Sequence, residues 1–432
     1  MTAQVARTLR VGMVGLGMIF EETYRPVFEK LRRDGICTRQ YRVEVELAAA
    51  ATRTGRRAEQ LRAQSPTLSC MTSYVGADAA SRMVHEHLDV VCVASPDDRH
   101  YEAARAALMA GCHVLIEKPS VLRLQELEDL LDLAAAKKVL AKVVYHKLLD
   151  PDHKRLRTLV ADGVLRHVNH GYCSLLEPKK VSRQFAPWIE GRNPGTYVAV
   201  HYFKLIDFSF FRGTGARLQS VRATGQRGLV GSVHGSTWDS VQVQLAYAYP
   251  DGREAAFDIH TSWVTPDNFP GYVEQEVQFR FDNAVWNAHQ RRRGVEVTIE
   301  GLTPEEIKET PNHHYNGDFL EPWGERVRRG YGLEAIERFF AEVAEVEAGG
   351  PPEERDQRLA RMRQLSYNDL SADVPIVAAV QSLEAILAAH AQGRRGAEAL
   401  LDWSAGRLLL RFPGSSQEMV LYEGKLLQEP GT

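Results

Sequence analysis

Residues 9–17 read LRVGMVGLG, an apolar run that ends in two closely spaced glycines. The run predicts a buried strand, and residues 21–33 carry the apolar spacing of a helix. Gly15 and Gly17 allow a tight turn from strand to helix and let the backbone approach a pyrophosphate. Phe20 stands where the usual G-x-G-x-x-G pattern has a third small residue, so a tight turn without a ligand is the alternative.

Strand and helix patterns alternate over the first 150 residues. Strands are predicted at residues 43–51, 88–94, 113–116 and 139–145, and helices at residues 101–110 and 124–138. Short connections between such segments are typical of a parallel sheet covered by helices on both faces. We therefore assign residues 1–150 to a Rossmann dinucleotide-binding domain of the α/β class.

The pattern changes after about residue 150. Strict alternation occurs at residues 241–249, 277–281 and 295–299, a buried helix is predicted at 374–390, and a closing hairpin at 408–427. Alternation indicates sheets with one buried face, which are usually antiparallel. Residues 151–432 are therefore assigned to an α+β domain with a largely antiparallel sheet.

Length and composition limit the class of protein. A chain of 432 residues is too long for one ordinary core, which favours two domains. Its 53 basic and 56 acidic side chains give a net charge of −3, which offers no attraction to nucleic acid or to an anionic membrane. Five cysteines without a Cys-x-x-Cys pair favour free thiols in a reducing compartment. No run reaches about 18 apolar residues and no signal sequence is visible, so we expect a cytoplasmic protein with no membrane partner.

The end of the second predicted strand bears on the choice of cofactor. Residues 51–57 read ATRTGRR and contain no carboxylate to accept hydrogen bonds from ribose hydroxyls. A small hydroxyl beside arginine suits a 2′-phosphate, so Thr52 and Arg53 favour NADP over NAD. A solvated basic loop is the alternative. The spacing from Gly17 to Thr52 exceeds the usual ~20 residues, which predicts an insertion near residues 33–42.

A dense motif follows the third and fourth strands of the first domain. It comprises Ser95-Pro96, His100 and residues 111–119, which read GCHVLIEKP. This cluster resembles the Gfo/Idh/MocA family, which contains glucose–fructose oxidoreductase and inositol dehydrogenases. The resemblance covers most of the chain and includes the glycine turn, Tyr145-His146, Asp150-Pro151 and a region that ends at His201.

The resemblance implies a Rossmann domain and a cis peptide before Pro119. It also implies that the α+β domain of residues 151–432 serves substrate binding and oligomerisation, with an open sheet that often forms dimers or tetramers. It also implies that Lys118 lies beside the nicotinamide. The cofactor-binding residues expected on this basis are Gly15, Gly17, Met18, Ile19, Thr52, Arg53, Ser95, Pro96, His100, Glu117 and Lys118. Alcohol oxidation needs a group that takes the hydroxyl proton, and a lysine can do so when its pKa is lowered.

A second motif departs from the family pattern of Asp, then His four residues on, then Asp three further on. Here the three positions are Tyr197, His201 and Lys204. If Pro194-Gly195 opens a helix, Tyr197 and His201 share a face and point into a cleft beside Lys118. We expect His201 to exchange the substrate proton, Lys118 to polarise the oxygen, and Tyr197 to orient the hydroxyl.

Two roles in this motif stay open. Tyr197 is either this hydrogen-bonding group or a packing aromatic. Lys204 either binds an acidic group of the substrate or points to solvent. We expect its side chain to point to solvent. Histidines at 167, 170, 313 and 314 lack the partner ligands of a zinc site, so no metal is expected.

These residues predict an NADP- or NAD-dependent oxidoreductase that moves a hydride to or from a hydroxyl-bearing carbon of a sugar, cyclitol or related polyol. The protein would work as a homodimer or homotetramer. One alternative is a redox-neutral enzyme that keeps its cofactor, such as an epimerase or an oxidation–elimination glycosidase. Another is a sensor that binds NADP without catalysis.

Overall fold

The structure is a computed structural model that describes residues 5–428, apart from 38–40, 186–187, 234, 271–272, 292, 294, 301–305, 310–311, 366 and 416–417. The chain forms two compact units, each built from two segments. The first unit comprises Met1–Leu149 and His314–Asp373, and the second comprises Asp150–His313 and Val374–Thr432. The predicted boundary at residue 150 matches the point where the chain first passes from the first unit to the second. The prediction of one domain over 151–432 is wrong for residues 314–373, which pack with the first unit.

The first unit contains a seven-stranded sheet of the Rossmann type, as predicted. Its strands are β1 (Val5–Val14), β2 (Ile36–Cys37), β3 (Arg42–Thr52), β4 (Thr72–Val75), β5 (Val90–Val93), β6 (His113–Glu117) and β7 (Ala141–Val144). The order is β2-β3-β1-β5-β6-β7, with β4 also paired to β3. All pairs are parallel except β2 with β3. The short strand β2 belongs to the insertion that the sequence predicted near residues 33–42.

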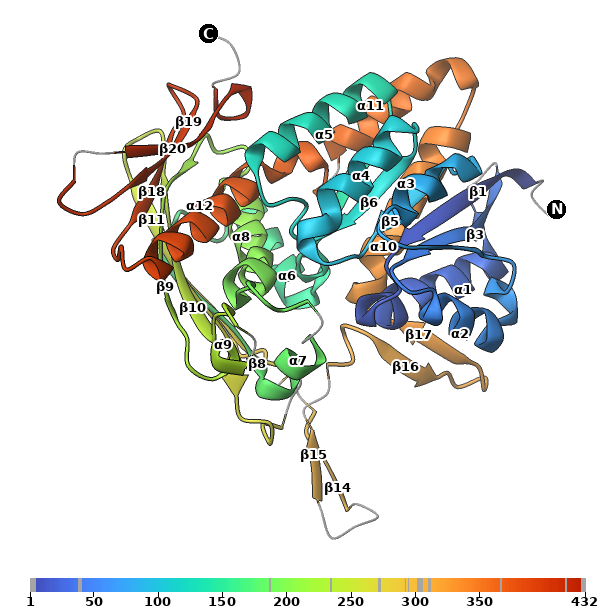
Figure 1. The fold of residues 1–432 in the computed structure, drawn as a ribbon, viewed down its shortest axis with the longest axis horizontal. Coiled ribbons are helices and arrows are strands. Elements are labelled where there is room, and N and C mark those ends of the chain that lie inside the picture. Colours follow the sequence, from blue (N-terminus) through green and yellow to red (C-terminus); the bar gives the residue numbers. More distant parts are fainter. Residues whose placement is uncertain are drawn as a thin grey trace. The chain divides into compact units, whose positions relative to one another are not determined.

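Helices cover both faces of this sheet (Figure 1). The helices of the N-terminal segment are α1 (Arg25–Asp34), α2 (Arg56–Gln64), α3 (Ala79–Met83), α4 (His100–Met109) and α5 (Leu124–Lys137). A Cβ added to Gly12 of β1 would lie 2.8 Å from the side chain of Met83, so this face of the strand is packed against α3. Val11 and Met13 point to the opposite face, where they join the core that contains Phe28 of α1.

The second segment of this unit supplies α10 (Tyr331–Ala348) and α11 (Arg355–Leu365) to the same core. The rings of Phe28 in α1 and Phe340 in α10 meet edge to face, with centroids 5.7 Å apart. The apolar stripe of α10 is buried along its length, and Ile336 and Val343 are fully buried. Residues 331–365 therefore complete a hydrophobic core that residues 1–149 leave open on one side.

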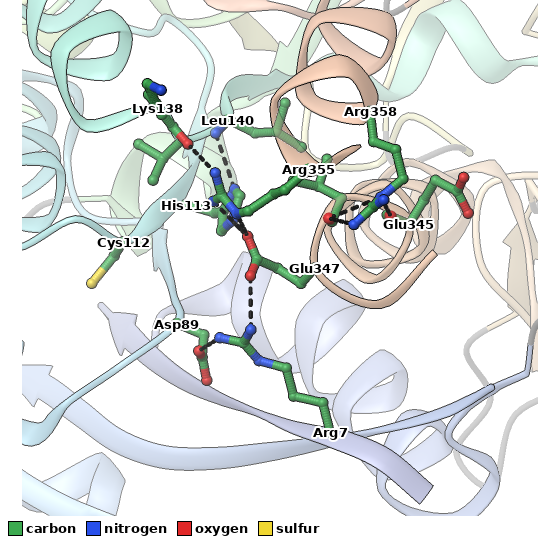
Figure 2. Close-up of polar contacts among 12 residues, drawn as sticks. Arg7, Asp89, Cys112, His113, Lys138, Leu140, Glu345, Glu347, Arg355 and Arg358 are labelled. Carbon is green, nitrogen blue, oxygen red and sulfur yellow. Dashed lines mark hydrogen bonds and ion pairs between the residues drawn. The ribbon is translucent and has the colours of Figure 1, made fainter. Parts of the chain in front are cut away.

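A polar network ties α10 to the sheet (Figure 2). Glu347 accepts hydrogen bonds from Arg7 of β1 (2.7 Å), from Nε2 of His113 in β6 (2.9 Å) and from Arg355 of α11 (2.6 Å). Nδ1 of His113 accepts from the backbone N–H of Leu140 at 3.0 Å, so Nε2 carries the ring proton. Burial alone would raise the pKa of Glu347, but the hydrogen bonds from His113 and Arg355 and the charge of Arg355 lower this pKa to about 2.

The second unit contains a nine-stranded sheet with the order β13-β12-β8-β11-β10-β9-β18-β19-β20. The strands are β8 (Val168–Pro178), β9 (Arg217–Gln226), β10 (Ser240–Ala248), β11 (Glu254–Thr265), β12 (Glu274–Phe281), β13 (Val285–Ala288), β18 (Glu398–Asp402), β19 (Arg407–Arg411) and β20 (Glu418–Glu423). Only β8 and β11 pair in parallel, so the predicted largely antiparallel sheet is confirmed. The predicted closing hairpin is β19–β20.

The remaining elements of the second unit are helices and a hairpin. The helices are α6 (Pro151–Ala161), α7 (Lys179–Gln184), α8 (Val200–Ile206), α9 (Val230–Val233) and α12 (Val374–Ala391), and the hairpin is β14 (Val297–Glu300) with β15 (Glu306–Glu309). Another hairpin, β16 (Gly317–Leu320) with β17 (Arg326–Arg329), belongs to the first unit.

The span Leu370–Ala391, which includes α12, is long and apolar enough to cross a membrane by length and composition. More than half of its most apolar window, 56%, is buried inside the structure. Val377, Val380 and Leu383 of α12 are fully buried, and α12 packs on β9 and α8 within the second unit. A buried core helix passes the same test of hydropathy, so the span is weak evidence for a membrane segment.

Candidate active site

The glycine turn after β1 has a backbone that only glycine adopts easily. Gly15 has φ +92°, and its N–H donates to the carbonyl of Ala51 in β3 at 3.0 Å. A Cβ at Gly15 would lie 2.4 Å from the carbonyl oxygen of Ala94, so a larger residue would clash with the end of β5. At Gly17 an added Cβ would meet only the guanidinium of Arg57, at 3.8 Å. The turn therefore leaves its second glycine open to a phosphate group.

The helix after the turn begins at Met18 and contains a π-helical turn, Phe20–Tyr24, before α1. Pro26 has no N–H, so it cannot donate to the carbonyl of Glu22 as an α-helix requires. That carbonyl instead accepts a hydrogen bond from Nδ2 of Asn316 at 2.7 Å. The sequence predicted one regular helix over residues 21–33, and the proline accounts for the difference. The amides at Met18 and Ile19 begin the helix, where they suit an anion.

An arginine that follows the end of β3 lies at the glycine turn. The sequence analysis did not single out this arginine. Nη1 of Arg57 donates to the carbonyl of Leu16, between the two glycines, at 2.7 Å. Thr52 accepts from the N–H of Gly55 at 3.0 Å through its hydroxyl, and Arg53 is exposed. Gly55 precedes α2, so Arg57 lies in the first turn of that helix. Residues 51–57 contain three arginines. The helix that begins at Arg56 had to be known before Arg57 could be identified as the arginine that contacts the turn.

The ends of β5 and β6 are joined by a buried histidine. The ring of His100 is 1% exposed, and its Nε2 and Nδ1 each lie 2.8 Å from a backbone carbonyl, those of Ser95 and Pro119 respectively. Burial lowers the pKa of His100, while the two carbonyl contacts oppose this. The peptide between Lys118 and Pro119 is cis, as the resemblance implied. His100 therefore links the loops that follow β5 and β6, because both of its ring nitrogens contact backbone carbonyls of these loops.

Lys118 lies half-buried at the C-terminal end of β6. Because β1, β5 and β6 are adjacent parallel strands, Lys118 shares one edge of the sheet with Ser95 and the glycine turn. Open parallel sheets bind their ligands at this edge. The residue after the cis proline is also fixed, since Ser120 donates to the buried carboxylate of Asp373 at 2.7 Å.

Glu117 is buried beside Lys118, with 6% of its surface exposed. The hydroxyl of Tyr24 donates to its Oε1 at 3.1 Å, and Nε2 of His146 lies 3.8 Å from the same atom. Burial raises the pKa of Glu117 to about 7, although the charge of Lys118 and the hydrogen bond from Tyr24 oppose the rise. Burial and the charge of Lys118 lower the pKa of His146 to about 3. Of these groups, the sequence singled out Lys118 and Glu117 for the site.

The second motif lies in the second unit, on a π-helical turn, Gly195–Ala199, that continues into α8. The start of this turn is pinned by Asn193, which accepts from the N–H of Thr196 at 2.6 Å and donates to Glu384 of α12 at 2.8 Å. A helix therefore follows Pro194 as predicted, but with a π-helical first turn. Single π-turns occur frequently at functional sites.

Tyr197 is half-buried within a group of aromatic rings. Its ring centroid lies 5.2 Å from Phe185, 5.3 Å from Trp188 and 6.1 Å from Trp263. Trp263 is fully buried and donates from its indole nitrogen to Glu177 at 2.7 Å. These contacts support the packing role that the sequence left open for Tyr197, and they leave its hydroxyl chemistry as a prediction.

Lys204 is fully buried in α8, so the expectation that it points to solvent is wrong. Its neighbours Tyr202, Phe203 and Leu205 are also buried, because α8 lies in the core of the second unit, against α12. His201 is half-buried on the same helix. These residues and Lys118 belong to different units, so the expected meeting of His201 and Tyr197 with Lys118 stays a prediction.

One of the histidines set aside in the sequence, His167, has another partner. Arg253 contacts the ring of His167 at 3.0 Å. Over the described part of the chain, no three His, Cys, Asp or Glu side chains are grouped so that they could hold a metal ion.

Comparison with known proteins identifies the nucleotide-binding part. Residues 9–145 match the family GFO_IDH_MocA, described as an oxidoreductase family with an NAD-binding Rossmann fold. Over these residues the chain is therefore similar to the nucleotide-binding domain of the Gfo/Idh/MocA oxidoreductases. D-Glucoside 3-dehydrogenase of Escherichia coli (strain K12) is 30% identical over 168 residues, which are 39% of this chain and 43% of that protein.

Two further similarities bear on the cofactor and the fold. The scyllo-inositol 2-dehydrogenase (NADP(+)) of Bacillus subtilis (strain 168) is 34% identical over 82 residues, 19% of this chain and 23% of its own length. The match therefore spans less than half the length of these curated relatives. The solved structure of GenD2 from gentamicin A biosynthesis, in complex with NAD, has a TM-score of 0.63 at 18% identity. It covers 93% of this chain and 98% of its own, so the fold is shared over both units.

Proposed function

We propose that this protein is an oxidoreductase that transfers a hydride between a nicotinamide cofactor and a hydroxyl-bearing carbon of a sugar or cyclitol. The observation that carries the proposal is the shared sheet edge, where the glycine turn, Ser95 and Lys118 follow three adjacent parallel strands. The family match over residues 9–145 supports the choice of cofactor. Names of similar proteins, a D-glucoside 3-dehydrogenase and a scyllo-inositol 2-dehydrogenase, support the class of substrate.

The chain offers the groups that a dinucleotide needs. Gly17 leaves space for a pyrophosphate, the amides of Met18 and Ile19 begin a helix, and Arg57 holds a guanidinium at the turn. When bound, the nicotinamide accepts or returns the hydride. In alcohol oxidation the C–H bond breaks with its electron pair and the hydroxyl loses a proton, which leaves a carbonyl.

We also propose which side chains of this protein handle the proton that the hydroxyl loses. Lys118 is proposed to polarise the hydroxyl oxygen and share its proton, and His201 to exchange that proton with solvent. Tyr197 is proposed to orient the hydroxyl. Lys204 stays a candidate for an acidic group of the substrate.

For the cofactor we propose NADP over NAD. Thr52 and Arg53 replace a ribose-binding carboxylate, and Arg57 adds a second guanidinium close to the turn. Fluorescence titration should give tighter binding for NADPH than for NADH. Arg53→Ala should weaken NADPH binding about 10- to 100-fold, the loss of one charge-assisted hydrogen bond, and leave NADH binding unchanged.

Arg57→Ala should also weaken NADPH binding more than NADH binding. Arg56→Ala is the matched control, because Arg56 is the adjacent arginine of the same helix and equally exposed, whereas Arg57 is the one that contacts Leu16 of the turn. Equal or tighter binding of NADH by the wild-type protein would contradict the preference for NADP.

The reaction is tested by a panel of hexosides, free sugars and inositols with both cofactors. Net reduction of the cofactor with at least one of them is the expected outcome. Conversion of the sugar without net cofactor turnover would favour the redox-neutral alternative, and tight NADP binding without any conversion would favour the sensor. We further propose a cytoplasmic homodimer or homotetramer, which light scattering after gel filtration would test for the oligomeric state.

A further inference from the structure

The π-helical turn Gly195–Ala199 lies between two points where hydrogen bonds fix the chain. Before the turn, the carbonyl of Arg192 accepts from the backbone N–H of Trp238 at 3.2 Å. After the turn, the hydroxyl of the fully buried Tyr202 in α8 donates to the carbonyl of Ser174 in β8 at 2.8 Å. A π-turn closes over one residue more than an α-turn, so the segment holds an extra residue between these two points.

Packing leaves no room beside the first residue of this turn. A Cβ added to Gly195 would lie 2.8 Å from a methyl carbon of Leu383 in α12 and 2.9 Å from a methyl carbon of Val241 in β10. Both of these side chains are buried. Glycine therefore lets the backbone of the turn approach α12 closely, at the position of the polar residue that follows Leu383.

A group of three polar side chains joins the turn to α12 at this point. Oε1 of Glu384 accepts from the hydroxyl of Thr196 at 2.5 Å and from Nδ2 of Asn193 at 2.8 Å. Asn193 also donates to the hydroxyl of Thr196 at 3.1 Å and accepts from the backbone N–H of Thr196 at 2.6 Å. Asn193 and Thr196 are each 1% exposed, and buried polar groups are costly without partners. One oxygen of Glu384 therefore supplies an acceptor to two buried side chains.

Two residues of the second motif lie on the segment that this group holds. Tyr197 follows Thr196 directly, and its backbone N–H donates to the carbonyl of Asn193 at 3.3 Å. His201 is the second residue of α8, immediately after the turn. The ring of Tyr197 lies 5.3 Å from the ring of Trp188. A change in the turn would therefore move Tyr197 relative to both His201 and Trp188.

We propose that Glu384 is a positioning residue, which fixes the π-helical turn through Thr196 and Asn193 and so sets the direction of Tyr197 relative to His201. The proposal rests on the proposed function for the chemical roles of Tyr197 and His201. Since both donors share one oxygen of Glu384, the position requires an acceptor and does not require a negative charge. A displacement of about 1 Å at reacting groups lowers a rate by about 100-fold, so the contacts of Glu384 matter for catalysis.

The test replaces Glu384 and observes Trp188 by NMR in protein labelled with ¹⁵N-tryptophan, with the indole resonance assigned by its loss in Trp188→Phe. Glu384→Ala should move this resonance, because the ring of Tyr197 moves against Trp188. Glu384→Gln should restore the wild-type position, since its amide oxygen can accept the same two hydrogen bonds. An unmoved resonance in Glu384→Ala, or equal shifts in the two variants, overturns the proposal.

The matched control is Gln381→Ala on the same helix. Gln381 lies one helical turn before Glu384, and its side chain donates to the carbonyl of Leu421 at 2.9 Å. This variant should leave the resonance of Trp188 in place, and a shift as large as that of Glu384→Ala would contradict the proposal.

A second variant covers the case in which Glu384→Ala does not fold. Thr196→Val removes the hydroxyl that donates to Glu384 and keeps the shape of the side chain. It should move the resonance of Trp188, and Thr196→Ser, which keeps the hydroxyl, should move it less. An unmoved resonance in Thr196→Val overturns the proposal.

The two proposals fail in different ways. The NMR measurement needs no turnover, so a Trp188 resonance that moves as expected in a protein that converts no sugar or cyclitol sinks the proposed function and supports the positioning role. Where turnover is observed, Glu384→Ala should lower kcat by about 10- to 100-fold and leave KM for the cofactor nearly unchanged, and Glu384→Gln should recover most of kcat. An unchanged kcat with a raised KM for the cofactor would contradict the positioning role.

Discussion

At the scale of single residues, the backbone that follows Lys118 is held by two hydrogen-bonding side chains. The carbonyl of Pro119 is held by His100 at 2.8 Å, and Ser120 by Asp373 at 2.7 Å. The lysine itself is half-buried at the ligand-binding edge of the sheet. The loop that carries Lys118 is therefore fixed at Pro119 and at Ser120 by contacts within the first unit.

Replacement of Lys118 tests its assigned role. We expect Lys118→Ala to lower turnover by about 10²- to 10⁴-fold, the range for loss of an acid–base group, because the hydroxyl oxygen loses its polarising cation. Cofactor affinity, measured by fluorescence, should stay nearly unchanged. Near-normal turnover would show that the catalytic centre lies elsewhere.

The second motif yields a separate kinetic prediction. His201→Ala should flatten the acid limb of the pH–rate profile, because His201 is assigned the exchange of the proton. Tyr197→Phe should lower the reaction rate by a smaller factor, and equally at every pH, since the ring and its contacts with Trp188 are retained. The reverse pattern, with Tyr197→Phe inactive and His201→Ala almost normal, would transfer the proton role to the tyrosine.

At the scale of elements, α10 is fixed to the sheet by charge as well as by apolar packing. Glu347, near its C-terminal end, contacts Arg7, His113 and Arg355 from three other elements (Figure 2). Arg7 and His113 lie 340 and 234 positions away from Glu347, and Arg355 lies eight positions on, in another helix. No helix was predicted here from the sequence, and the partners of α10 depend on the tertiary fold.

This network predicts an acid sensitivity of folding. The pKa of Glu347 is lowered from 4.5 to about 2 in the folded protein. Its contribution to the free energy of unfolding is therefore fully present above about pH 4.5 and is lost as the pH falls towards 2. Glu347→Gln should destabilise the protein at pH 7 by about 1.5–3 kcal/mol, the value of a hydrogen bond to a charged group.

Urea unfolding at several pH values measures this effect. The variant Glu347→Gln should lose less stability than the wild type between pH 4.5 and 2, because the titrating group is absent. The exposed Glu353, in the turn before α11, provides the control, and Glu353→Gln should follow the wild type. Parallel curves for Glu347→Gln and wild type would contradict the assignment.

At the scale of the whole molecule, the chain enters the second unit at Asp150, returns to the first at His314 and leaves it again at Val374. The sheet of the first unit is complete within residues 1–149, but its hydrophobic core is not. Residues of α10, among them Phe339 and Phe340, supply the missing apolar surface.

A fragment of residues 1–149 should therefore fail to fold cooperatively. We expect it to bind the dye ANS and to melt over a broad range, because the surface that α10 covers is exposed. The same fragment joined by a flexible linker to residues 314–373 should melt in one transition by circular dichroism, and Phe340→Asp in the joined protein should abolish that transition. A cooperative transition for the short fragment alone would show that α10 is dispensable.

Local sequence determined much of this protein. Apolar runs and glycines located five of the seven strands of the Rossmann sheet and missed β2 and β4. Strict alternation predicted the antiparallel sheet, and the Glu117-Lys118-Pro119 motif identified one side of the candidate site. These features depend on neighbouring residues, since strand burial, glycine conformations and the cis proline are set by a few positions in a row. The same reasoning missed the π-helical turn at Phe20–Tyr24, which follows from Pro26 and from a distant amide, Asn316.

Tertiary structure decided the features that join residues far apart in the chain. Residues 314–373 belong with the first unit because their apolar side chains find an open core there, and periodicity states only that a helix buries one face. Lysine side chains are usually exposed to solvent. Lys204 is buried because the helix that carries it lies in the core of the second unit. The contact of Tyr24 with Glu117 bridges 93 positions. Burial and partner choice arise from packing between elements, which no local pattern of residues encodes.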